Sequence, residues 1–111
     1  MRTLALAVVI AIAPAIAHAG GLPSLTKGSP YVKARSTLLR SGFKPVRSAE
    51  NGCSIGREEI CKKYPEAEAC SGTGLGNCLF IWRQGGRVIE VSTVGETDLK
   101  VAAVKCRSGC R

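Results

Sequence analysis

This 111-residue chain has a single histidine, His18. It lies in an N-terminal segment that we expect to be removed, which would leave the mature protein without histidine. Without histidine, a protein cannot build a Ser-His-Asp triad, a Cys-His pair or an imidazole metal site. No apolar run reaches the roughly 18 residues that a membrane-spanning helix needs. These absences exclude histidine-dependent hydrolases, and we expect no transmembrane segment in the processed chain.

Residues 1–19 have the pattern of a secretory signal peptide. Arg2 supplies a positive charge before an apolar stretch at residues 4–17, and the Ala-His-Ala sequence at 17–19 provides the small residues that signal peptidase requires. We therefore expect a mature protein that begins at Gly20 and is exported, either periplasmic or secreted. Its 92 residues carry 15 basic and 8 acidic side chains, a net charge of +7.

All six cysteines lie in the mature chain: Cys53, Cys61, Cys70, Cys78, Cys106 and Cys110. An even number of cysteines in a short exported chain predicts a disulfide framework, although six cysteines allow fifteen pairings. Most of their spacings are longer than those of zinc ligands, and no C-x-x-C redox pair is present. We expect no metal and three bridges between neighbours in sequence, Cys53–Cys61, Cys70–Cys78 and Cys106–Cys110.

Two helices are expected. The Ser-Pro pair at 29–30 predicts the start of the first, with serine as N-cap, and Gly42 predicts its end as a left-handed cap with Phe43 folded back. A shorter helix is predicted over residues 56–64, where two Glu–Lys pairs lie four residues apart and Pro65 stops the helix.

Strand patterns dominate the second half of the chain. Residues 78–83 and 87–94 are apolar, β-branched and aromatic runs joined by Gln-Gly-Gly, which predicts a hairpin. Residues 43–47 predict a short edge strand, because Pro45 cannot donate to a ladder. Residues 99–106 suit a strand or a helix equally well.

These elements predict a small α+β fold, with two short helices packed on an antiparallel sheet of three or four strands and stabilised by disulfides. We expect residues 29–111 to form one domain after an irregular lead-in at residues 20–28. A mature chain of 92 residues with five aromatic side chains builds only a modest core, so the bridges would contribute much of its stability.

Motifs for catalysis are weak. The glycine-rich residues 71–77 are followed by a cysteine and a strand, so they fit neither a dinucleotide loop nor a Walker loop and predict a disulfide-closed turn. Five carboxylates could in principle supply an acid–base pair, but we expect all of them to be solvated: Glu58, Glu59, Glu66, Glu68 and Glu90. The sequence therefore predicts a protein that is not an enzyme and needs no cofactor.

Positive charge is concentrated at the two ends of the mature chain. The segment before Glu50 carries six basic residues and no acidic one, and the segment after Asp98 carries four. A basic field attracts anionic partners. We expect the partner-binding residues to be Lys33, Arg35, Arg40, Lys44 and Arg47, joined by Lys105, Arg107 and Arg111 of the tail. Nucleic acid is disfavoured as the partner, because no pair of stacking aromatics is interleaved with these cations.

Several motifs resemble those of an uncharacterised family of small exported bacterial proteins. The resemblance rests on Y-x-x-A-R-x-x-L-x-x-x-G-F-x-P at residues 31–45, Tyr-Pro-Glu at 64–66, Cys-Ser-Gly-Thr-Gly at 70–74, and Phe-x-Trp at 80–82. It implies export and a shared fold, and it implies no activity. The last two cysteines lie outside the pattern.

The function that the sequence favours is that of an exported, non-enzymatic protein that binds an anionic envelope or extracellular partner through a basic surface. An inhibitor or immunity-type protein directed against an acidic enzyme is the alternative. A histidine-independent enzyme is less favoured. The sequence does not identify the ligand, and it leaves the oligomeric state open.

Overall fold

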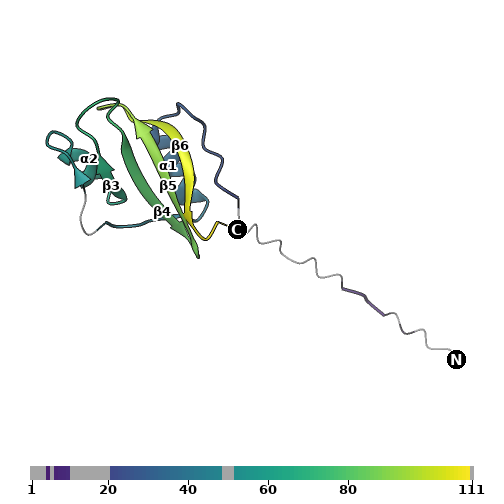
Figure 1. The fold of residues 1–111 in the computed structure, drawn as a ribbon. Helices are drawn as coiled ribbons and strands as arrows, with labels where there is room; N and C mark the ends of the chain where they lie inside the picture. The colour runs from purple at the N-terminus through teal and green to yellow at the C-terminus, as the bar shows by residue number, and fades with distance from the viewer. Residues whose placement is uncertain (1–4, 6, 11–20, 49–51, 111) are drawn as a thin grey trace.

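Two helices lie against one face of a six-stranded sheet in the computed structural model of the chain (Figure 1). The structure describes residues 5, 7–10, 21–48 and 52–110, so most of the predicted leader lies outside it. The α+β class with two helices agrees with the prediction, but the sheet is larger than the three or four strands expected.

Helix α1 spans Tyr31–Arg40 and buries Tyr31, Ala34 and Leu38, which lie on one helical face. Its C-terminus is the predicted glycine cap: Gly42 has a φ of 87°, and the Phe43 amide donates to the carbonyl oxygen of Leu38 at 2.9 Å. The predicted serine N-cap is wrong, because Pro30 occupies the N-cap position.

Ser29 makes its hydrogen bonds outside the helix and does not cap it. Its hydroxyl donates to the carbonyl oxygen of Thr26, and its own carbonyl accepts from the amide of Val101. A bridge between Pro30 and Lys100 continues this pairing, so the lead-in is held along the start of the last strand.

Helix α2 is shorter than predicted and spans Glu58–Lys63. Gly56 has a φ of 89°, which a helical residue cannot adopt, so the helix begins after it. The expected pairs four residues apart are not formed. Instead Glu59 and Lys62 make an exposed pair three residues apart at 3.6 Å, and the Glu58 carboxylate accepts from the Gly56 amide.

The six strands are β1 (Lys44–Pro45), β2 (Gly52–Cys53), β3 (Ala67–Cys70), β4 (Cys78–Gln84), β5 (Arg87–Val94) and β6 (Lys100–Ser108). Their order is β2-β3-β4-β5-β6, and β1 pairs with β4 beyond the end of β3. Strands β2 and β3 are parallel, so the sheet is mixed instead of antiparallel as predicted. A two-residue strand has no alternation of apolar and polar side chains, so β2 leaves no pattern in the sequence.

The predicted hairpin is confirmed by β4 and β5, which pair from Cys78 opposite Thr93 to Gln84 opposite Arg87. For residues 99–106 the sequence favoured neither a strand nor a helix. In the structure nearly all of them belong to strand β6, which pairs antiparallel with β5.

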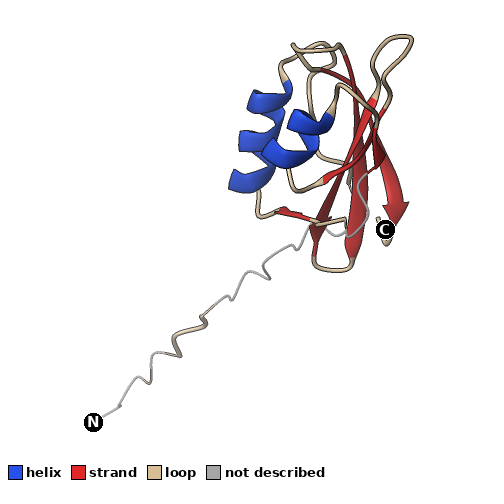
Figure 2. Cartoon of the chain, turned by 90° about the vertical axis from the view of Figure 1, so that its left-hand side faces the viewer, coloured by secondary structure: helices blue, strands red, loops and turns tan. Residues whose placement is uncertain are grey.

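The core lies between α1 and the inner face of the sheet (Figure 2). Phe80 and Trp82 of β4 and Val91 of β5 pack there against Tyr31 and Leu38, and none of the five is more than 1% exposed. The rings of Tyr31 and Phe80 are stacked with centroids 3.9 Å apart. In the described part of the chain, neither helix has the length and apolar character that a bilayer crossing requires.

Three disulfides join the cysteines in the pairs predicted from sequence proximity: Cys53–Cys61, Cys70–Cys78 and Cys106–Cys110. The first ties β2 to α2, and the second joins β3 to β4 at directly opposed positions in the core. The third closes a short loop at the end of β6, where Cys106 is exposed.

The bridges should contribute unequally to stability. Replacing Cys70 and Cys78 by alanine removes a cross-link and buried side chains, so we expect a loss of about 3 kcal/mol or more. Replacing Cys106 and Cys110 by alanine should cost no more than about 2 kcal/mol, because only a short loop is released. Urea unfolding followed by circular dichroism measures both, and equal losses would contradict the assignment of the Cys70–Cys78 bridge to the core.

Candidate functional site

Glu66, immediately before β3, carries the most deeply buried charge among the described residues and is 0% exposed. Its Oε1 accepts hydrogen bonds from the Tyr31 hydroxyl at 2.9 Å and from Nε of Arg35 at 2.6 Å. The indole Nε1 of Trp82 donates to the Tyr31 hydroxyl oxygen at 3.2 Å. A buried carboxylate is tolerated when it is paired and hydrogen-bonded, so this network fixes α1 on the sheet.

The contacts with Glu66 shift the pKa values of Arg35 and Tyr31. The hydrogen bond to Glu66 raises the pKa of Arg35 above its ordinary value, which keeps the guanidinium charged. Burial, followed by the charge of Glu66, raises the pKa of Tyr31, which keeps the phenol neutral. Neither side chain exchanges a proton near neutral pH, and both hold hydrogen bonds to the Glu66 carboxylate.

The structure differs from the sequence-based expectations for two residues of this network. Glu66 was expected to be solvated and is buried, and Arg35 was expected to bind a partner but is engaged with Glu66. The signal that could have suggested this pairing is the spacing of Tyr31 and Arg35, which places both on one face of α1. The acidic partner is 31 residues away from Arg35 and has no local signature.

A second charged group lies on the outer face of the sheet. Arg107 of β6 donates to both oxygens of Glu68, at 2.9 and 2.6 Å, and to Glu90 of β5 at 3.0 Å. The bridge crosses β4, where Ile81 lies opposite Glu90 and is 4% exposed. Glu68 and Glu90 are therefore paired and not simply solvated. Arg107 does not join the cations of α1, as the sequence suggested, because it is held by these carboxylates.

Exposed cations gather instead at the end of the sheet where β4 turns into β5. Lys44 of β1 lies directly opposite Arg83 of β4, and both are exposed. Arg40 lies in the last turn of α1, which is tied to this end by a hydrogen bond from Gln84 to the carbonyl oxygen of Ser41. Among the described residues, none of the three cations has a carboxylate within ion-pair distance. We call Arg40, Lys44, Arg83 and the neighbouring Arg87 the basic end.

Arg87 completes the basic end and lines a groove of about 740 Å³ beside the lead-in. Its guanidinium lies 5.3 Å from the centroid of the Phe43 ring and donates to the carbonyl oxygen of Gly21 and to the side chain of Gln84. Thr37 lines the same groove. The sequence pointed away from Arg83 and Arg87, because both lie in the acidic middle segment of the chain and only strand pairing brings them to Lys44.

The other predicted binding residues are exposed but more dispersed. Lys33 lies two helical turns before Arg40 on α1, and Arg47 lines a small hollow with Lys62. Lys105 is exposed on β6, and Arg111 lies outside the described residues. The structure thus brings Arg40 and Lys44 together and leaves Lys33 and Arg47 outside that group.

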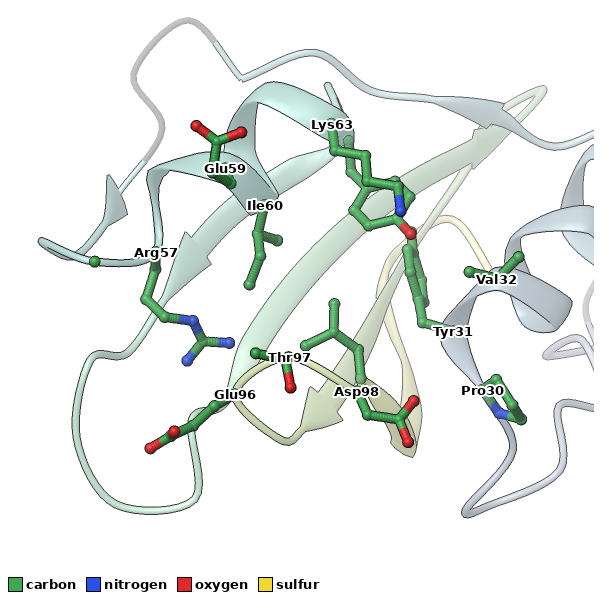
Figure 3. Close-up of a pocket in the computed structure, with 13 residues that line it drawn as sticks. Pro30, Tyr31, Val32, Arg57, Glu59, Ile60, Lys63, Glu96, Thr97 and Asp98 are labelled. Atoms are coloured by element: carbon green, nitrogen blue, oxygen red, sulfur yellow. The ribbon is translucent and has the colours of Figure 1, made fainter.

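A pocket of about 410 Å³ opens between the start of α1, helix α2 and the turn between β5 and β6 (Figure 3). Its walls are apolar where Tyr31, Ile60 and Leu99 line it, and charged residues surround its mouth. It lies at the opposite end of β5 from the basic end, so the two features are separate.

Arg57 forms one wall of this pocket and is 7% exposed. Its Nη1 donates to the carbonyl oxygen of Ser71 at 2.6 Å, and its Nη2 donates to those of Gly76 at 3.3 Å and Gly95 at 3.0 Å. Its Nε has no hydrogen-bond partner in the described structure. Carbonyl oxygens accept from the two Nη groups but do not neutralise the charge, so Arg57 is a buried cation without a counter-charge in the described structure.

In the described part of the chain, no three His, Cys, Asp or Glu side chains are grouped so that they could hold a metal ion.

Searches against protein-family profiles, curated proteins and solved structures find no match to this chain. The functional argument therefore rests on the basic end and the pocket.

Removing the Glu66 carboxylate should destabilise the fold far more than removing an exposed one. In Glu66→Ala, Arg35 loses its partner and the Tyr31 hydroxyl loses its acceptor, so we expect a loss of about 3 kcal/mol. The matched control Glu59→Ala breaks an exposed pair and should change stability by less than about 0.5 kcal/mol. Urea unfolding of the two variants decides the point, and similar losses would show that the buried network is not stabilising.

The pair of Glu68 and Arg107 should give a pH-dependent contribution. The hydrogen bond from Arg107 lowers the pKa of Glu68 below its ordinary value of 4.5. The contribution is therefore present above the unfolded-state pKa and is lost as the pH falls through the lower folded-state pKa. Because both side chains are more than a third exposed, we expect less than about 1 kcal/mol after solvent screening.

The measurement is the free energy of unfolding of wild type and Glu68→Gln from neutral to acidic pH. Their difference should be largest at neutral pH and should shrink below the unfolded-state pKa. In an Arg107→Gln background the same substitution should have little pH-dependent effect, and an unchanged profile there would assign the dependence to other groups.

Proposed function

We propose that this protein is an exported, non-enzymatic binding protein whose basic end contacts an anionic surface of the cell envelope. The observation that carries the proposal is the direct opposition of Lys44 and Arg83 on neighbouring strands. Like charges at directly opposed positions destabilise a strand pair. Because no described carboxylate lies within ion-pair distance of either side chain, an anionic partner would relieve this repulsion.

The neighbouring side chains support the same function. Arg40 adds a third exposed cation at this end, and the half-buried Arg87 adds a further cation beside the groove. Three disulfides in so short a chain are compatible with an oxidising compartment and therefore with export.

A phospholipid surface is the simplest probe of this proposal. Each cation near an anionic membrane contributes about 1 kcal/mol, so reversing two of them in Lys44→Glu/Arg83→Glu should weaken binding to phosphatidylglycerol vesicles by at least about tenfold. Binding should also fall when salt is raised from about 0.01 M to about 0.15 M, because the Debye length shrinks from about 30 Å to about 8 Å. Vesicle co-sedimentation measures both effects.

The control variant Lys27→Glu/Lys105→Glu has the same net charge and changes exposed cations away from the basic end. It should retain most of the binding, and phosphatidylcholine vesicles should bind neither protein. Arg35 is left unchanged, because its reversal would unpair Glu66. If both double variants lost binding equally, net charge and not the basic end would be responsible, and binding that ignored salt would exclude the proposal.

A further inference from the structure

The pocket between the two helices is independent of the basic end and has the size and lining of a small-molecule site. Its volume of about 410 Å³ lies within the range of ligand pockets, roughly 300–1,000 Å³. Ile60, Leu99 and the ring of Tyr31 supply apolar walls, and Val32 of α1 adds an exposed apolar side chain. An apolar group of a ligand would remove this surface from water.

The acidic and basic side chains around the pocket point in different directions. Figure 3 shows the carboxylates of Glu59, Glu96 and Asp98 directed away from the cavity, while Lys63 bends toward it. Glu59 is paired with Lys62, and Asp98 is paired with Lys100 at 3.2 Å. The acidic groups therefore lie in water at the rim, where their effect on a bound ligand is screened.

The cations facing the cavity have no acidic partner in the described structure. Lys63 is exposed, and its ammonium lies 5.4 Å from the centroid of the Tyr64 ring. At the other end of α2, the N-cap residue Arg57 is 7% exposed, and its Nε has no hydrogen-bond partner in the described structure. A positive charge that is buried without a counter-charge attracts an anion more strongly than one in water, because the surrounding dielectric is lower.

We propose that this pocket binds a small amphiphilic carboxylate, with its apolar chain against Ile60 and Leu99 and its carboxylate next to Lys63, in the field of Arg57. A medium-chain fatty acid is the simplest ligand of this class. The chain supplies the apolar contact, and the carboxylate supplies the negative charge that the two cations lack. This site is separate from the surface that carries the proposed function.

The test compares three ligands with the same alkyl chain and different charges: octanoate, 1-octanol and octylamine. Amide chemical shifts of the full mature protein should move on adding octanoate at Ile60, Lys63, Thr97 and Leu99. Octanoate should bind about tenfold more tightly than octanol, as expected for a hydrogen bond to a charged group, and octylamine should bind most weakly. Lys63→Gln should weaken octanoate binding by about two- to fivefold and leave octanol binding unchanged.

The neighbouring substitution Lys62→Gln is the matched control, since Lys62 does not line the pocket. It should leave octanoate binding unchanged, as should Lys44→Glu/Arg83→Glu at the basic end. Octylamine binding as tightly as octanoate would overturn the proposal, because the rim carboxylates would then dominate. Shifts confined to the basic end, or no shifts with any ligand, would also overturn it.

Discussion

The carboxylate of Glu66 is the constraint on which the packing of the helix and the sheet depends. It is fully buried, so the fold must supply it with a positive charge and hydrogen-bond donors. Arg35 and Tyr31 can both reach it only if α1 lies on the sheet with one particular rotation about its axis. Trp82 then donates to Tyr31 from β4, so the same polar chain also fixes the register between helix and strand.

This constraint also decides which charges are left for a partner. Arg35 is used by Glu66 and Arg107 by Glu68 and Glu90, so two of the predicted binding residues serve the fold. The cations without carboxylate partners at the end of the β4–β5 hairpin come from both the basic and the acidic segments of the sequence. Net charge along a chain therefore indicates that a basic surface exists without locating it, because strand pairing determines which side chains become neighbours.

Local signals predicted local structure well. Gly42 ended its helix as expected, because the cap depends on residues within one turn, and the pairs of cysteines nearest in sequence did form the bridges. The signals failed where the partner is far away. The short strand β2 pairs with β3 through contacts that no periodicity shows, and Glu66 looks like a surface residue until Arg35 is brought to it. Part of the candidate site was hidden for the same reason, since Arg83 meets Lys44 only across the sheet.

The glycine-rich loop at residues 71–77 has a structural reason for one of its glycines. A Cβ at Gly76 would lie 2.8 Å from Nη1 of Arg57 and 3.0 Å from the carbonyl oxygen of Gly95, so the loop can close around the guanidinium only with glycine there. The bridge between Cys70 and Cys78 holds the two ends of the loop together. The loop thus surrounds a protein cation with its own carbonyl oxygens. Because Arg57 also forms one wall of the pocket, the loop that surrounds its guanidinium holds a pocket residue in place.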